Sequence, residues 1–128
     1  MNRNSKGFTL IELVTVIAIL GVLAAMTVPK FFDLQSKAQE EVENQIIGTI
    51  RAGLETFAAN EIVQNGSKSY PNANSSTLLA DILNPIPEDW AYASGATTGT
   101  ITHTRADATL KEYEYTSAGG ATYTLSAI

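Results

Sequence analysis

The sequence has 128 residues and no cysteine, with 13 acidic against 8 basic side chains and a formal net charge of −5. A chain of this length folds as one small domain rather than two. The acidic balance argues against direct binding to nucleic acid, because there is no basic patch to neutralise phosphates. Without cysteine the chain forms no disulfide and offers neither a thiol nucleophile nor a thiolate metal ligand.

An apolar stretch near the N-terminus, residues 8–28, predicts a membrane-spanning helix. A helix of this length crosses the hydrocarbon core of a bilayer, which is about 30 Å thick. Arg3 and Lys6 precede the stretch, and basic residues beside a span usually stay on the cytoplasmic side. The small residue Gly7 stands before the apolar run, which is the wrong side for ordinary signal-peptide removal. We therefore expect a membrane anchor with a cytoplasmic N-terminus.

Glu12 is the one charged residue within this apolar stretch. A carboxylate costs about 2.5 to 3.5 kcal/mol at the centre of a bilayer, and less near the end of a span. Cleavage between Gly7 and Phe8 would create an α-amino cation roughly one helical turn from Glu12, on the same chain or on a neighbour. The alternative is a plain single-pass anchor in which Glu12 reaches the lipid headgroups.

The segment 6–13, with the sequence KGFTLIEL, and the apolar helix that follows it resemble the class III signal of type IV pilins and type II secretion pseudopilins. The continuation over residues 28–36 is most similar to pilins of the mannose-sensitive haemagglutinin type. The resemblance implies that residues 1–7 form a leader that prepilin peptidase removes, so that Gly7 and Phe8 are the processing residues. It also implies N-methylation of Phe8 and pairing of Glu12 with the N-terminus of an adjacent subunit during assembly.

Apolar residues recur every four positions beyond the span and predict an amphipathic helix over residues 30–62; they are Leu34, Ala38, Val42, Ile46, Ile50, Leu54 and Ala58. The charged residues between them, including Glu43, are expected on the solvent side. The membrane-spanning helix is predicted over residues 8–29. Pro29 lacks an amide proton, which predicts a kink or break there, and Gly21 adds local backbone freedom. The resemblance implies that the segment from Gly21 to Pro29 unwinds on assembly; a static kink is the alternative.

Residues 63–88 are rich in Asn, Ser, Gly and Pro and predict a connecting loop. A short helix with its apolar residues on one side is expected within this loop, capped at its start by the Ser75–Thr77 segment. Asn84 to Pro87 then end that helix.

Residues 89–128 predict an antiparallel meander, with strands starting at Trp90 and continuing over 99–105, 110–116 and 121–126. Tyr113 and Tyr115 share one face of their strand, and we expect that face to cover the middle of the amphipathic helix. The predicted fold class is α+β: a long N-terminal helix, membrane-spanning in its first half, packed on a small antiparallel sheet. The resemblance implies the same architecture, the pilin fold.

No catalytic pattern stands out in the sequence. His103, the single histidine, is predicted within a strand with no carboxylate close by in the sequence, which favours a surface or packed side chain. There is no phosphate-binding glycine loop, nucleophile elbow or paired metal-ligand motif. The acidic residues of the C-terminal part lack the spacing of a calcium loop. We therefore predict no enzymatic activity, no cofactor and no metal site.

We interpret the chain as a structural subunit of a type IV pilus, polymerised through its N-terminal helix. The expected partners are copies of itself in a helical filament, prepilin peptidase, the inner-membrane assembly machinery and the membrane. The precursor is expected in the inner membrane and the mature subunit in an extracellular pilus. A type II secretion pseudopilin in a periplasmic pseudopilus, and a membrane-tethered binding module that never polymerises, are the alternatives. Adhesion and motility remain open as roles of such a pilus.

Overall fold

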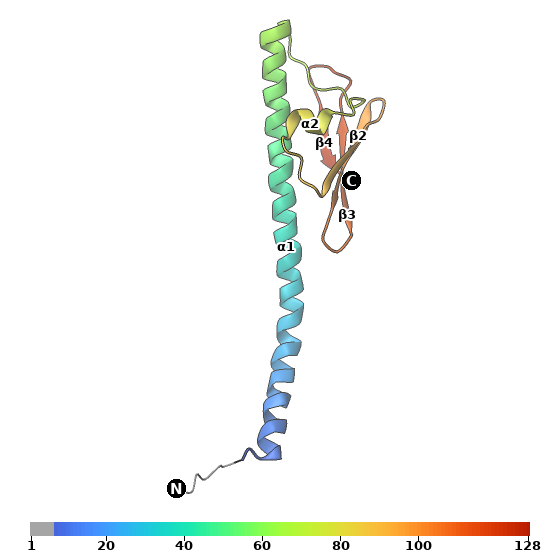
Figure 1. The fold of residues 1–128 in the computed structure, drawn as a ribbon. Helices are drawn as coiled ribbons and strands as arrows, with labels where there is room; N and C mark the ends of the chain where they lie inside the picture. The colour runs from blue at the N-terminus through green and yellow to red at the C-terminus, as the bar shows by residue number, and fades with distance from the viewer. Residues whose placement is uncertain (1–6) are drawn as a thin grey trace. The chain divides into compact units, whose positions relative to one another are not determined.

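The computed structural model describes residues 7–128 (Figure 1). These residues divide into two compact units, the first ending at Glu40 and the second running from residue 41 to residue 128. One helix, α1 (Leu10–Asn65), contributes residues to both units. The predicted leader lies outside the described residues, except for Gly7.

The part of α1 in the first unit carries exposed apolar side chains along its length. An 18-residue window of α1 has a mean hydropathy of 2.4 and no residue buried within the structure, so the helix is long and apolar enough to cross a membrane. No break interrupts α1 at Pro29. A proline removes a single amide donor from a helix, and the hydrogen bonds of the neighbouring turns are enough to carry the helix past it.

The second unit begins with the C-terminal part of α1, which ends at Asn65, three residues beyond the predicted end at Ile62. Gly66 follows with a φ angle of 72°, and its amide donates to the Ile62 carbonyl at 3.0 Å. Glycine adopts this left-handed conformation at little cost, which is why it commonly ends helices.

The short helix α2 (Leu78–Ile82) forms where the sequence predicted it, and it buries Leu78 and Leu79. The predicted side-chain cap is wrong, because Thr77 occupies the N-cap position without capping the backbone. Its hydroxyl donates instead to the Asp81 carboxylate at 2.9 Å. The Leu78 amide bonds to the Ser75 carbonyl at 3.3 Å, so a backbone turn closes the start of the helix.

The sheet is a four-stranded antiparallel meander in the order β1-β2-β3-β4, as predicted, with β1 (Trp90–Ala93), β2 (Thr98–Thr104), β3 (Leu110–Thr116) and β4 (Thr124–Ala127). Strand β4 begins three residues later than the predicted Ala121. The segment before it pairs elsewhere: the Ala73 amide donates to the Ser117 carbonyl and the Tyr70 amide to the Gly120 carbonyl, both at 3.0 Å. The connecting loop thus pairs with residues that precede the predicted start of β4.

The core of the second unit lies between α1 and one face of the sheet, which runs along the helix in Figure 1. Tyr113 and Tyr115 point into this core, as predicted, and the Tyr115 hydroxyl donates to the Pro71 carbonyl at 2.7 Å. From α1 come Ile50 and Leu54, both fully buried. Burial of each such aliphatic side chain contributes about 1.5–3 kcal/mol. The architecture is therefore α+β, a helix on a small antiparallel sheet, and it matches the pilin fold.

The predicted apolar stripe on α1 is wrong at its N-terminal end. Val42, expected in the stripe, is 53% exposed, whereas Glu43, expected on the solvent side, is only 2% exposed. A four-residue repeat drifts around a helix of 3.6 residues per turn. Residues counted back from Ile50 in steps of four therefore rotate away from the sheet, and after two steps, at Val42, the side chain no longer faces it.

Gly53→Ala is expected to destabilise the second unit, whereas Gly48→Ala is expected to stabilise it. A Cβ atom at Gly53 would overlap the Ile82 side chain and lie 3.2 Å from the Ile82 carbonyl oxygen. Such overpacking costs about 1–3 kcal/mol, more than the helix preference of alanine over glycine, about 1 kcal/mol. A Cβ atom at Gly48 meets nothing within 4 Å. Urea unfolding of the full chain in detergent micelles, followed by Trp90 fluorescence, measures both effects. Equal changes in the free energy of unfolding for the two variants would contradict the close contact between position 53 and Ile82.

Candidate functional site

The first turn of α1 is closed by reciprocal hydrogen bonds between Thr9 and Glu12. The Glu12 oxygen Oε2 accepts hydrogen bonds from the Thr9 backbone amide and hydroxyl, each at 2.8 Å. In return, the Glu12 amide donates to the Thr9 hydroxyl at 3.3 Å. This is a capping box, which satisfies amides that have no helical partner. The helix therefore begins at Leu10, two residues after its predicted start at Phe8.

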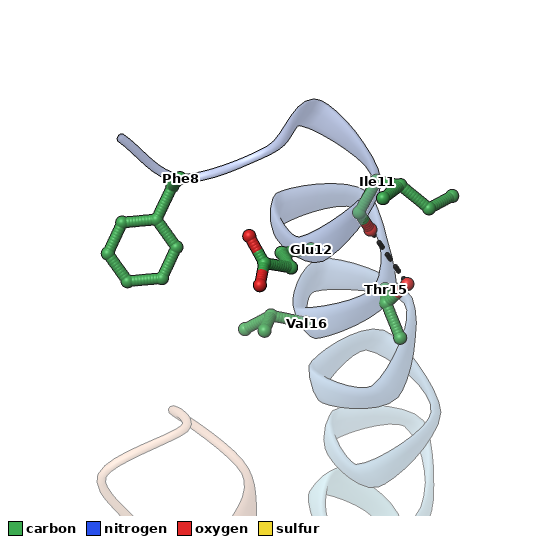
Figure 2. Close-up of a pocket in the computed structure, with 5 residues that line it drawn as sticks. All are labelled: Phe8, Ile11, Glu12, Thr15 and Val16. Carbon is green, nitrogen blue, oxygen red and sulfur yellow. Dashed lines mark hydrogen bonds between the residues drawn. The ribbon is translucent and has the colours of Figure 1, made fainter. Parts of the chain in front are cut away.

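Phe8 precedes the helix and has 93% of its surface exposed. Its ring and the Glu12 carboxylate lie on the same side of the helix start (Figure 2). Both line a shallow hollow together with Ile11, Thr15 and Val16. The Thr15 hydroxyl donates to the Ile11 carbonyl at 2.7 Å. Of the five residues that line the hollow, Glu12 is the one with a charged side chain. The residues predicted for methylation and for assembly, Phe8 and Glu12, thus share one small region of surface.

Gly21 and Pro29 lie further along α1 and are not among the residues that line this hollow. A Cβ atom at Gly21 would meet nothing within 4 Å, so no contact among residues 7–128 requires glycine there. The role of both residues in assembly remains a prediction.

A second polar site lies in the core of the second unit, where α1 meets the end of β2. The Glu43 carboxylate accepts two hydrogen bonds from the Arg105 guanidinium, Nε to Oε1 at 2.6 Å and Nη2 to Oε2 at 2.8 Å. His103 Nδ1 lies 2.8 Å from the same Oε1 atom. The His103 ring stacks on Trp90 with centroids 4.7 Å apart. A carboxylate from α1 is therefore held by a side chain of β2, His103, and by Arg105, the first residue after β2.

The electrostatics of this cluster favour the ionised carboxylate. Hydrogen bonds from Arg105 hold the pKa of Glu43 below its usual range, although burial acts in the opposite direction. The two-pronged geometry is the one in which guanidinium and carboxylate bind most strongly. In residues 7–128, no three His, Cys, Asp or Glu side chains gather as a metal site would require. The cluster is arranged to fix α1 against the sheet.

Sequence reasoning missed both of these hydrogen-bond sets. The capping box had a detectable signal, since Thr9 and Glu12 are spaced as its T-x-x-E pattern requires. The buried cluster had none of comparable strength, because His103 and Glu43 are 60 residues apart. The interpretation of His103 as surface or packed left its carboxylate partner unidentified.

Comparisons with known proteins match the N-terminal segment and, with several relatives, most of the chain. The family described as the prokaryotic N-terminal methylation motif matches residues 2–28. A fimbrial protein of Neisseria meningitidis is 34% identical over 104 residues, covering 79% of this chain and 58% of the relative. A type IV major pilin protein of Neisseria gonorrhoeae is 36% identical over 105 residues, covering 79% of this chain and 60% of the relative.

A type II secretion system core protein G of Pseudomonas aeruginosa is 31% identical over 91 residues, covering 69% of this chain and 60% of the relative. The chain thus spans about three fifths of the length of these relatives. No solved structure matches it.

A methylation motif ahead of an apolar helix, followed by a helix-on-sheet unit, defines a pilin-like structural subunit. The chain belongs to the family of type IV pilins and type II secretion pseudopilins. This is a family of structural proteins rather than of enzymes.

Proposed function

We propose that this chain is the structural subunit of a type IV pilus, cut by prepilin peptidase between Gly7 and Phe8 and polymerised through its N-terminal helix. One observation carries the proposal: the first part of α1 is apolar and exposed, and it bears a single carboxylate, Glu12, close to its start. So much exposed apolar surface requires a medium or a partner to cover it. In the precursor the inner membrane covers it, and in the filament neighbouring copies do.

Glu12 sets the axial stagger between subunits in this proposal. Cleavage after Gly7 exposes the α-amino group of Phe8, which is then N-methylated and keeps its positive charge. In an apolar filament core, a subunit at the wrong height leaves Glu12 unpaired, at a cost of up to about 2.5–3.5 kcal/mol. A subunit at the right height pairs Glu12 with the amino group of its neighbour. The charge therefore acts against incorrect staggers.

The segment from Gly21 to Pro29 is proposed to unwind when subunits pack. Pro29 leaves one backbone carbonyl of α1 without its amide donor, and Gly21 is the most permissive residue of the segment. Such loosening lets neighbouring helices approach closely while the second unit keeps its fold. The helix of the single subunit, continuous through Pro29, is then the state before assembly.

A pseudopilin of a type II secretion system is the second candidate, supported by the similarity to the core protein G of Pseudomonas aeruginosa. The N-terminal chemistry would be the same, and the filament would be short and periplasmic. The inner-membrane assembly machinery is a partner in either case. Accumulation of the filament in the periplasm, with none at the cell surface, would favour this candidate.

Intact-mass analysis and cryo-electron microscopy of material sheared from expressing cells test the proposal. We expect filaments whose subunits lack residues 1–7 and carry one additional methyl group. Density for the segment from Gly21 to Pro29 would report directly on its unwinding. Full-length chain confined to the membrane of a host with active prepilin peptidase would refute the proposal and favour a tethered binding module.

A further inference from the structure

The exposed apolar surface of α1 does not end where a membrane span would end. Phe31, Phe32 and Leu34 follow Pro29 and are 67%, 64% and 67% exposed. The two phenylalanines also line a shallow apolar hollow with Thr27 and Val28. Large side chains with this exposure lie outside the core of the second unit, so packing within the chain does not account for them.

The depth of these residues follows from helix geometry. A span of about 20 residues fills the hydrocarbon core, so a span that begins at Leu10, where α1 begins, ends at Pro29. The headgroup layer adds about 5–7 Å on each side, or about three to five residues of helix. The segment 30–34 then lies within the outer headgroup layer. Residues 35–37 lie at its outer edge, and their side chains lean back toward the membrane because helical side chains tilt toward the N-terminus of the helix. This placement rests on the proposed membrane anchoring of the precursor.

The distribution of side chains around the helix also fits an interface between lipid and water. At about 100° per residue, Phe31, Phe32 and Leu34 spread over an arc of about 160°. Lys30 and Lys37 lie on the remaining side, together with Asp33. Large apolar side chains together with lysines just beyond a span are typical of the level at which a membrane helix leaves the hydrocarbon core. Lysine side chains there extend toward headgroup phosphates.

We propose that the segment 30–37 binds the outer phospholipid headgroup layer before assembly. Phe31 and Phe32 insert at the boundary of the hydrocarbon core, and Lys30 and Lys37 contact lipid phosphates. The apolar surface of the segment is continuous with that of the span, and the two lysines complement the negative charge of lipid phosphates, which favours a lipid layer over a protein partner. The segment then fixes the height of the subunit in the membrane.

Site-directed spin labelling tests the depth of the segment in the full-length chain. The chain has no cysteine, so Ala25→Cys, Gln35→Cys and Ala59→Cys each provide a unique label site. The chain is reconstituted in vesicles of phosphatidylethanolamine and phosphatidylglycerol, and label depth is measured from accessibility to oxygen and to a water-soluble nickel complex. We expect a deep label at position 25, a label at headgroup depth at position 35 and an aqueous label at position 59.

The double substitution Phe31→Ser and Phe32→Ser is expected to shift the label at position 35 to the accessibility of position 59. The matched control, Phe31→Leu with Phe32→Leu, keeps the apolar surface and is expected to keep the headgroup depth. An aqueous label at position 35 in the otherwise unchanged chain, with position 25 deep, overturns this inference alone. An aqueous label at position 25 overturns the membrane anchoring itself. Protection at position 35 that disappears at high lipid-to-protein ratio assigns the surface to a second copy and overturns the lipid contact.

Discussion

Glu12→Ala is expected to reduce the recovery of sheared filaments by more than about tenfold, while membrane insertion and removal of residues 1–7 remain intact. An unpaired carboxylate penalty of about 2.5 kcal/mol corresponds to a population ratio of about sixty between correct and incorrect staggers. Without Glu12 that discrimination is lost, whereas the apolar surface that inserts into the membrane is unchanged. Immunoblots of sheared and membrane fractions, with the mass of the membrane-bound chain, measure assembly and processing separately.

Glu12→Gln separates the two roles that the structure gives this residue. A glutamine at this position still closes the capping box with Thr9, because the pattern accepts Glu or Gln, but it has no charge to pair with an amino group. If the charge selects the stagger, Glu12→Gln assembles as poorly as Glu12→Ala. Normal filaments from Glu12→Gln would show that assembly does not need the negative charge and would leave the capping of α1 as the role of this side chain. Normal filaments from Glu12→Ala would show that assembly needs neither the charge nor the cap.

Glu43→Ala is expected to destabilise the second unit by about 3–5 kcal/mol, the usual cost of removing one partner from a buried ion pair. The Arg105 and His103 side chains, 19% and 11% exposed, would lose the carboxylate that both contact. Urea unfolding of the full chain in detergent micelles measures the loss, and Trp90 is a suitable fluorophore because it stacks on His103. Glu41→Ala, an exposed position on the same helix, is the matched control and should change stability by no more than about 0.5 kcal/mol.

The pH dependence of stability gives a second readout of the same substitution. The pKa of Glu43 is depressed in the folded chain, so its stabilisation is present above the pKa of the unfolded glutamate, about 4.3. It is lost as the pH falls through the lower folded pKa. The unfolding midpoint of the unsubstituted chain should therefore drop more steeply below about pH 4 than that of Glu43→Ala. Parallel profiles would mean that the pKa of Glu43 is not depressed in the folded chain.

The features that depend on local sequence patterns could be predicted from the sequence alone. Alternating side chains placed Tyr113 and Tyr115 on the core face of β3, and turn residues separated the strands of the meander. The apolar run that starts at Phe8 was long enough to identify the membrane-competent part of α1. These predictions succeed because side-chain period and turn chemistry are properties of short segments.

Features that depend on contacts between residues far apart in the chain could not be predicted from the sequence. Burial of Glu43 follows from the approach of Arg105 at the end of β2, and a carboxylate on a helix is otherwise expected in water. Before β4, the Gly120 carbonyl accepts a hydrogen bond from Tyr70, a residue of the connecting loop, which has no regular sequence pattern. A single sequence does not show which loop residues form hydrogen bonds with the segment before a strand. Tertiary contact decided both cases.

The order of the strands has a consequence for how the chain acquires its fold. Each strand pairs with the next one in the sequence, so the hairpins close over short loops and can form one after another. The salt bridge from Arg105 to Glu43 spans 62 residues and has the larger loop-closure entropy to overcome. We expect the hairpins to form early and this bridge late, once the sheet can dock on a helix already held at the membrane. The domain can then mature without oxidative folding catalysts, because it contains no cysteine to oxidise.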